Sequence, residues 1–203
     1  QTAESGVAFT ANFFLGRLAR PELAIAAFGV LDGMMRVLLG PLRNMTPAVQ
    51  TLTRGAADLG VMTRFSLQIA VVFALTMLAF QIPALRRFAL ETVMGLPADM
   101  AEYISPALQL AFVLALCMTG AALARGLLLS SRETNAIAFS SGARLLAVCL
   151  VGGWAVAYGY DNGAVVGLLA LIGAFGAEAI ILGYQVVRLR ARDGGLFGRI
   201  EDR

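Results

Sequence analysis

Apolar residues run through this chain in long stretches that are separated by short polar turns. Residues 65–85 and 104–124 each form a run of 21 residues without a charged side chain. A helix needs about 20 such residues to cross the ~30 Å hydrocarbon core of a bilayer. The pattern therefore predicts an all-α polytopic membrane protein. Any charged residue inside an apolar stretch then needs a partner or a function.

Six transmembrane segments are predicted, at residues 1–18, 22–42, 61–81, 100–129, 135–158 and 164–187. The first is read as the remainder of a helix that starts upstream, because its apolar run, 5–16, is too short to span. Pro21 suits the first position of the second helix, and Pro41 would kink that helix if it continues. Together the six helices form one bundle over residues 1–192, followed by a cytoplasmic tail at 193–203.

Residues 83–95 differ from the spans because apolar and charged side chains fall on opposite sides of a helix. This pattern predicts an amphipathic helix that lies in the membrane interface. The apolar side carries Leu85, Phe88, Ala89 and Met94, and the charged side carries Arg86, Arg87 and Glu91.

Composition supports a membrane location. Hydrophobic residues make up 59% of the chain and charged residues only 14%, against about 25% in a soluble domain. All the positive charge is arginine, and no basic cluster interleaved with aromatic residues suggests a nucleic-acid partner. Cys117 and Cys149 lie in apolar spans, so neither a disulfide nor a metal site is expected.

The distribution of arginines predicts the orientation of the bundle. The connections after the second and fourth spans and the C-terminal tail carry Arg43, Arg54, Arg64, Arg125, Arg132, Arg188, Arg190 and Arg192, whereas the opposite side carries Arg17, Arg20, Arg86 and Arg87. The richer side is expected to be cytoplasmic. Both termini then lie inside, in a cell membrane such as a bacterial inner membrane.

Glu178 is the most informative single residue, because no other charge occurs between 162 and 187. A carboxylate in a membrane span costs several kcal/mol unless it is paired or protonated. One interpretation is a proton-carrying group that couples transport to a gradient. The alternative is a structural role, in which Glu178 pairs with an arginine or bonds a neighbouring helix.

Asp32 and Arg36 lie four residues apart in the second span, so they share a helix face and can pair. The pair is either a self-compensating structural element or a contact to an anionic substrate, which arginine can bind through two hydrogen bonds. Glu4 and Arg144 are further candidates for substrate or ion binding. Arg144 would either reach the cytoplasmic face or line a cavity, and Arg125 is interpreted as an anchor at that face.

Two pairs of glycines, Gly29/Gly33 and Gly163/Gly167, have the spacing that lets membrane helices approach closely. We expect them to serve helix packing. No catalytic constellation occurs, since there is no histidine, nucleophile elbow or phosphate-binding glycine loop. Asp99 and Glu102 are interpreted as charges at a helix N-terminus. An enzyme is therefore not predicted, and no cofactor is expected.

The last three spans carry a recognisable arrangement. Residues 123–126 (Leu-Ala-Arg-Gly) end the fourth span, residues 129–134 form a polar turn, and residues 158–164 (Tyr-Gly-Tyr-Asp-Asn-Gly-Ala) lead into the sixth. This resembles the closing half of a six-helix unit of the multidrug/oligosaccharidyl-lipid/polysaccharide (MOP) flippase superfamily, which includes the multidrug and toxic compound extrusion (MATE) transporters.

A narrower resemblance is to the progressive ankylosis (ANK) transporter family. Residues 26–41, from Ala-Ala-Phe-Gly-Val to Gly-Pro, are similar to the second helix of that family, and Gly176-Ala177-Glu178 is similar to a Gly-x-Glu of its sixth helix. The resemblance implies functional roles for Arg36 and Glu178. Asp32 departs from the family pattern, and Glu4 aligns only with a shift.

These resemblances imply a MATE-like half of a secondary active exporter, whose partner is a second six-helix bundle from the same gene or from a homodimer. The substrate would be a small anionic or amphiphilic solute such as pyrophosphate, citrate or a nucleotide, exchanged against a proton or sodium gradient. The alternatives are a lipid-linked saccharide flippase and a non-transporting membrane scaffold subunit.

Overall fold

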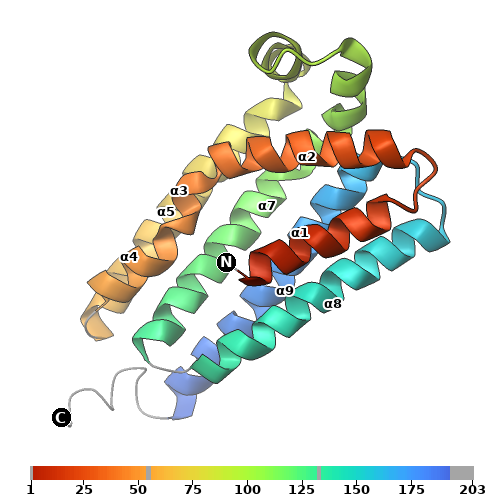
Figure 1. The fold of residues 1–203 in the computed structure, drawn as a ribbon. Coiled ribbons are helices and arrows are strands. Elements are labelled where there is room, and N and C mark those ends of the chain that lie inside the picture. Colours follow the sequence, from red (N-terminus) through yellow and green to blue (C-terminus); the bar gives the residue numbers. More distant parts are fainter. Residues whose placement is uncertain (1, 54–55, 132–133, 193–203) are drawn as a thin grey trace.

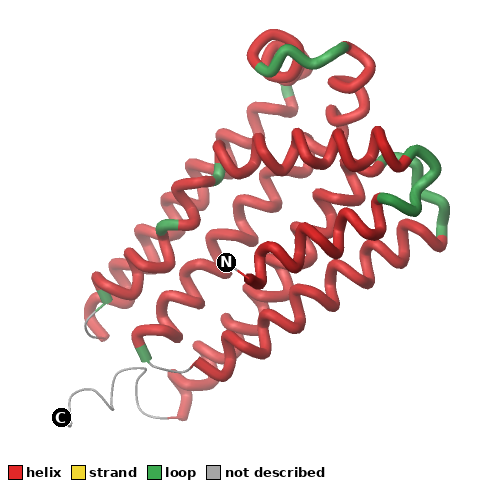
Figure 2. Tube along the Cα trace, viewed as in Figure 1, coloured by secondary structure: helices red, strands yellow, loops and turns green. Residues whose placement is uncertain are grey.

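The computed structural model describes residues 2–53, 56–131 and 134–192, and within these ranges the chain is helical without a strand (Figure 2). The side chains at 2–5, 56–57, 134, 190 and 192 lie outside the described set. The predicted tail, 193–203, also lies outside it. The long helices are α1 (Thr2–Leu15), α2 (Pro21–Leu38), α5 (Ala56–Leu78), α7 (Ala98–Ser130), α8 (Thr134–Ala157) and α9 (Gly163–Arg192).

Helices α7 and α9 form the centre of the bundle. They pack along each other, with α5 against the free side of α7 and α8 against the free side of α9 (Figure 1). Half of the apolar window of α7 and of α9 is buried, against 22% in α5 and α8. The outer faces of α5 and α8 expose large apolar side chains such as Val72, Leu75, Leu146 and Leu150, as expected for helices that face lipid.

The prediction of an all-helical chain with apolar helices of membrane-spanning length is confirmed, but six spans are not. Four described helices are long and apolar enough to cross a membrane, and a bent pair over Pro21–Leu38 and Gly40–Leu52 makes a possible fifth. The apolar part of α1 covers only Gly6–Leu15, which is about half the length that a crossing requires.

The second span breaks near Pro41. Helix α2 ends at Leu38, and α3 (Gly40–Arg43) and α4 (Met45–Leu52) continue at an angle of 68°. The cause is local, because Pro41 lacks the N–H that would continue the helical hydrogen bonds. The bend turns α4 along α7, where Gly126 lets Val49 approach so closely that a Cβ at Gly126 would lie 2.6 Å from the Val49 Cβ.

The predicted helix at 83–95 is present in a modified form. After the 3₁₀ turn η1 (Ala79–Gln81), helix α6 (Pro83–Arg87) widens into the π-helical segment η2 (Phe88–Val93). Gly95, at φ 67°, then reverses the chain toward α7. The segment caps the ends of α5 and α7 (Figure 1). Its position in a membrane interface remains a prediction.

The two glycine pairs have different surroundings. A Cβ at Gly163 would overlap Ala24, and a Cβ at Gly167 would overlap the ring of Phe28, so this pair lets α2 lie directly on α9. No atom lies within 4 Å of the Cβ position at Gly29 or at Gly33. The packing role is therefore confirmed for the pair on α9, and nothing described packs against the pair on α2.

Hydrogen bonds around Tyr103 fix the connection between α8 and α9. The Tyr103 hydroxyl donates to the Asp161 carbonyl (2.8 Å) and accepts from the Gly163 N–H (2.6 Å). The Asn162 amide donates to the Tyr103 carbonyl (2.9 Å), and its oxygen accepts from the Val165 N–H (3.1 Å) as a helix cap. The start of α9 is thereby held against the start of α7.

Candidate functional site

A buried charge cluster joins the three C-terminal helices. Glu178, on α9, is 2% exposed and lies between Arg125 of α7 and Arg144 of α8. Arg125 donates to Glu178 Oε1 from Nη2 and from Nε, the latter at 3.0 Å. Arg144 Nη1 lies 3.6 Å from Oε2, on the other side of the carboxylate. One acid thus holds two arginines from two neighbouring helices.

Arg144 is itself deeply buried, at 4% exposure, and its guanidinium lies 4.7 Å from the centre of the Phe175 ring. An aromatic face attracts a cation, more strongly when water is excluded. Glu178 and Phe175 are three residues apart on α9, so both contacts come from one helix face. Of the two predicted positions for Arg144, the structure shows the one beside a cavity.

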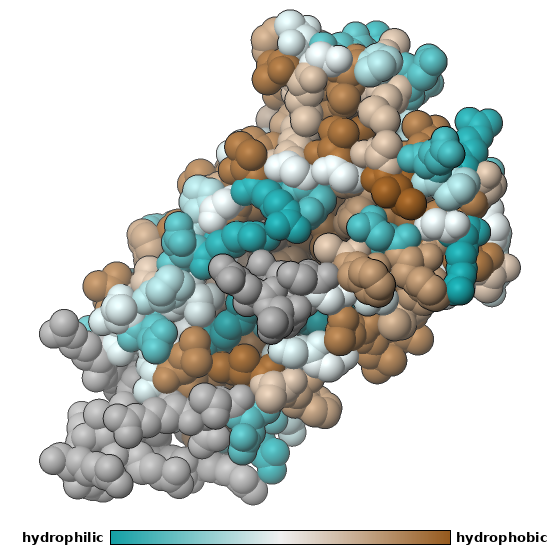
Figure 3. Space-filling model, in the orientation of Figure 1, coloured by the Kyte–Doolittle hydropathy of each residue, from teal (hydrophilic) through white to brown (hydrophobic). Residues whose placement is uncertain are grey.

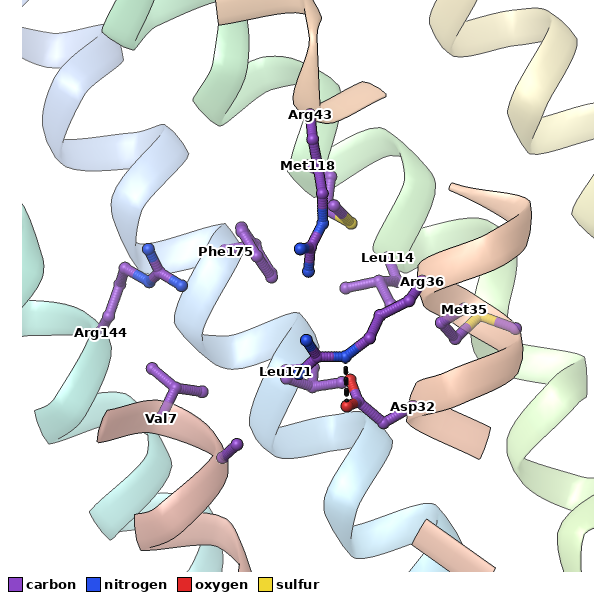
Figure 4. A pocket seen from close by; sticks show the side chains of 11 residues that line it. Val7, Asp32, Met35, Arg36, Arg43, Leu114, Met118, Arg144, Leu171 and Phe175 are labelled. Carbon is purple, nitrogen blue, oxygen red and sulfur yellow. Dashed lines mark hydrogen bonds and ion pairs between the residues drawn. The ribbon is translucent and has the colours of Figure 1, made fainter. Parts of the chain in front are cut away.

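A small open hollow of ≈30 Å³ lies in front of this cluster. Helices α1, α2, α3, α7, α8 and α9 all contribute to its wall (Figure 4). Its polar side chains are Asp32, Arg36, Arg43 and Arg144, and the apolar ones include Val7, Leu114 and Phe175. Figure 4 shows Arg36, Arg43 and Arg144 directed from three sides toward the space beside Phe175.

A second hollow of ≈50 Å³ adjoins the first and shares Arg43, Met118 and Phe175 with it. Arg125 lines this second hollow, with Thr46 and Ala122. The bend at Pro41 matters here, because it brings Arg43 between the two spaces. We refer to the two adjoining hollows together as the recess, with Asp32 in the wall of the first and Arg125 in the wall of the second.

Asp32 and Arg36 form the predicted pair at the rim of the recess. Arg36 Nε lies 2.6 Å from Asp32 Oδ2. The Arg36 side chain is 47% exposed and the Asp32 side chain is 22% exposed. In Figure 3, hydrophilic side chains gather in the middle of the displayed face, over α2 and α3, with hydrophobic surface on both sides. The polar recess is thus surrounded by surface suited to lipid or to another apolar helix.

The structure brings four of the five predicted site residues together. Asp32, Arg36 and Arg144 line the recess, and Glu178 lies behind it on Arg144. The side chain of Glu4 lies outside the described residues, although its backbone belongs to α1. The structural interpretation of Glu178, an acid that pairs with arginine, is the arrangement observed.

Two arginines of the recess were not among the predicted site residues. Arg125 was expected to anchor a helix end at the cytoplasmic face, but it reaches inward to Glu178. Arg43 was assigned to a connection, yet it lies on α3 and lines both hollows. A usable signal was present, since Arg125 directly follows the uncharged run 104–124 and a lone acid lies in the facing span.

The electrostatics of the recess favour an anion. Among the described side chains at the recess, four arginines (Arg36, Arg43, Arg125 and Arg144) face two acids, Asp32 and Glu178. Guanidinium groups bind carboxylates and phosphates through paired, charge-assisted hydrogen bonds. Within the described part of the chain no group of three potential metal ligands occurs.

Comparison with known proteins adds no relative: no family model, no curated protein and no solved structure matches this chain. The likeness to the MOP superfamily and to the ANK branch therefore stays a prediction from the residues quoted above.

Proposed function

We propose that this chain is one helical bundle of a membrane transporter that carries a small anionic solute, and that the recess between α2, α7 and α9 is its binding site. The observation that supports this most is the set of four arginines that surround one recess within apolar helices. Charges inside membrane helices are costly, and their usual use is in a substrate or ion path.

The charged groups suggest how binding and coupling would work. Glu178 occupies two guanidinium groups, those of Arg125 and Arg144. An anionic solute in the recess would compete with the Glu178 carboxylate for these donors. Loss of the Glu178 charge leaves the donors to the solute, and the charged carboxylate takes them back. Glu178 and the solute thus compete for one set of donors, which couples the state of Glu178 to the occupancy of the site.

This competition predicts the effect of removing the Glu178 charge. In Glu178→Gln the arginines face a neutral amide, so affinity for an anion should be higher than in the original protein. The measurement is binding of pyrophosphate and citrate by the two purified proteins, with flux measured in proteoliposomes.

The comparison between the original protein and Glu178→Gln makes this test specific. The solute carries the same charge in both measurements, so the difference in affinity reports Glu178. The emission of Trp154 and thermal unfolding check that the variant is folded. Equal affinity and equal flux for a folded Glu178→Gln protein would contradict the coupling role. The anion-binding role would then still rest on the arginines.

The arginine at the rim provides a separate test of anion binding. Arg36 is half-exposed and contacts only Asp32 among the described residues, so Arg36→Gln should leave the fold intact. Loss of one charge-assisted contact should weaken anion binding roughly tenfold. The matched control is Arg17→Gln, since Arg17 lies outside the recess and stacks on Phe13 at 3.8 Å. Equal binding by both variants would contradict the proposal.

A scaffold subunit is the second candidate, and one observation favours it. Glu178 is fully buried with arginine on both sides, as a structural tie between helices would be. The double variant Asp32→Asn with Arg36→Met separates the two functions. A transporter should lose flux and keep its fold and assembly. A scaffold that uses this pair as its contact should lose its partner instead.

A further inference from the structure

A second hollow with a different charge pattern lies at the end of the bundle that α6 and η2 cap. It is open, with a volume of ≈460 Å³, and it separates this capping segment from the first two turns of α7. Arg86, Arg87 and Glu91 contribute charges from the capping segment, and Glu102 and Ser105 face them from α7. The volume lies within the range of ligand sites in proteins, about 300–1,000 Å³.

The four charged groups around this hollow are not paired with one another. Within the described residues, no ion pair or hydrogen bond joins either arginine to Glu91 or Glu102. Arg86 is held in place by the preceding turn η1, because its Nη1 donates to the Phe80 carbonyl at 2.8 Å. Two positive and two negative groups therefore surround one space, and a ligand that carries both charges would satisfy them.

Apolar side chains beside the hollow indicate where such a ligand would come from. Ile82, Leu85, Phe88 and Val93 of the capping segment are 39–69% exposed. In a helical segment that joins two membrane spans, exposed apolar residues of this kind bury themselves at the boundary between head groups and acyl chains. The charged hollow then lies at the depth of the lipid head groups.

We propose that this hollow binds a phospholipid with a zwitterionic phosphoethanolamine head group, independently of the transport function proposed above. Arg86 and Arg87 contact the phosphate through charge-assisted hydrogen bonds. Glu91 and Glu102 accept hydrogen bonds from the primary ammonium. A phosphatidylglycerol head group lacks the cation for the two acids, and a choline head group has no N–H to donate to them.

The test is competition between lipids for the delipidated full-length protein in detergent. An equimolar mixture of phosphatidylethanolamine, phosphatidylcholine and phosphatidylglycerol is added, and the retained lipid is identified by native mass spectrometry. Phosphatidylethanolamine should be enriched roughly tenfold over each of the others, the effect of one additional charge-assisted contact. Soluble glycerophosphoethanolamine at the same concentration should not displace it, because acyl chains add apolar contact.

Three variants assign the contacts. Arg87→Gln should lose the retained lipid, because it removes a contact to the phosphate. The fold should be unchanged, because no described residue depends on Arg87 for a hydrogen bond. Arg17→Gln is its control, because Arg17 lies in the connection at the same end of the bundle. The double variant Glu91→Gln with Glu102→Gln should still bind lipid but should no longer distinguish ethanolamine from choline.

Several outcomes would overturn the proposal. Enrichment of phosphatidylglycerol would show simple attraction to the arginines, and equal retention of all three lipids would show a solvated polar surface. Displacement by the soluble head group would show a ligand from water. Equal behaviour of Arg87→Gln and Arg17→Gln would place any lipid that is retained elsewhere on the protein.

Discussion

Helices α2 and α9 carry the same two sequence features and use them in opposite ways. Each has a Gly-x-x-x-Gly pair and a charged group inside an apolar stretch. On α9, Gly163 and Gly167 are covered by α2, and Glu178 is buried between arginines of two other helices. On α2, Gly29 and Gly33 face open space, and Asp32 pairs within its own helix at a partly exposed rim.

The difference separates a helix whose glycines and charge are satisfied within the bundle from a helix whose glycines and charge remain accessible. On α9 both features are satisfied by this bundle, so changes there should affect stability, and at Glu178 also the proposed competition with the solute. On α2 the charged pair faces a recess, and the glycines face nothing in the described structure. Changes on α2 should therefore leave the bundle stable and act on whatever enters the recess or covers the helix.

Removal of the Glu178 charge should have the largest effect on stability. Glu178→Leu removes the carboxylate that pairs with Arg125 and with the buried Arg144, and loss of one partner of a buried pair costs about 3–5 kcal/mol. Asp32→Asn, by comparison, should cost about 1 kcal/mol or less, because its pair is partly exposed. The measurement is the free energy of unfolding of both variants in mixed micelles.

A combined variant checks the physical reason. Glu178→Leu together with Arg125→Met and Arg144→Met removes the whole cluster, and apolar replacement of buried ion pairs is often neutral. Stability should return close to that of the original protein. If the triple variant is as unstable as Glu178→Leu, the cost arises from packing rather than from the unpaired charges.

The glycine pairs test the same contrast through changes of intermediate size in the free energy of unfolding. Gly167→Ala places a methyl group on the ring of the buried Phe28, and overpacking of this kind costs about 1–3 kcal/mol. Gly33→Ala meets no atom within 4 Å and should stabilise the helix by about 0.4–1 kcal/mol. Unfolding of the two alanine variants in micelles gives both values.

The sign of the Gly33→Ala effect carries additional information. If the variant is stable in micelles but loses oligomers or flux in lipid, another helix covers this face of α2 in the assembled protein. A destabilised Gly33→Ala monomer would contradict the description of α2 as open. Gly183→Ala is a suitable control, because nothing lies within 4 Å of its Cβ position either.

Much of the fold follows from the sequence, because the signals are local. The apolar runs indicate α5, α7, α8 and α9, Pro21 indicates the start of α2, and Pro41 indicates its break. The count of six spans is not confirmed, because the apolar part of α1 covers only Gly6–Leu15 in the described chain and the second span is bent. Hydrophobicity gives the number of apolar runs, but it does not give the direction of a helix after a proline.

The site was less predictable, because its contacts join helices that are distant in sequence. The Asp32–Arg36 pair is local and follows from a spacing of four residues. The partners of Glu178 lie 53 and 34 residues before it, so a single sequence shows that a partner is needed without showing which one. Arg125 and Arg43 were assigned to helix ends because the positive-inside pattern describes arginines near turns equally well.

Asp32→Asn should have the smallest effect on stability and a distinct effect on binding. The change removes the partner that holds Arg36 Nε at 2.6 Å, while Arg36 remains in the recess. The freed guanidinium gains capacity for an anion, so pyrophosphate and citrate should bind several-fold more tightly, with thermal stability close to that of the original protein. Asp99→Asn, on an exposed acid at the start of α7, is the matched control. Tighter binding in both variants would indicate a general effect of net charge. Unchanged binding in Asp32→Asn would show that Arg36 acts only as the partner of Asp32, and the open face of α2 would then resemble the structural face of α9.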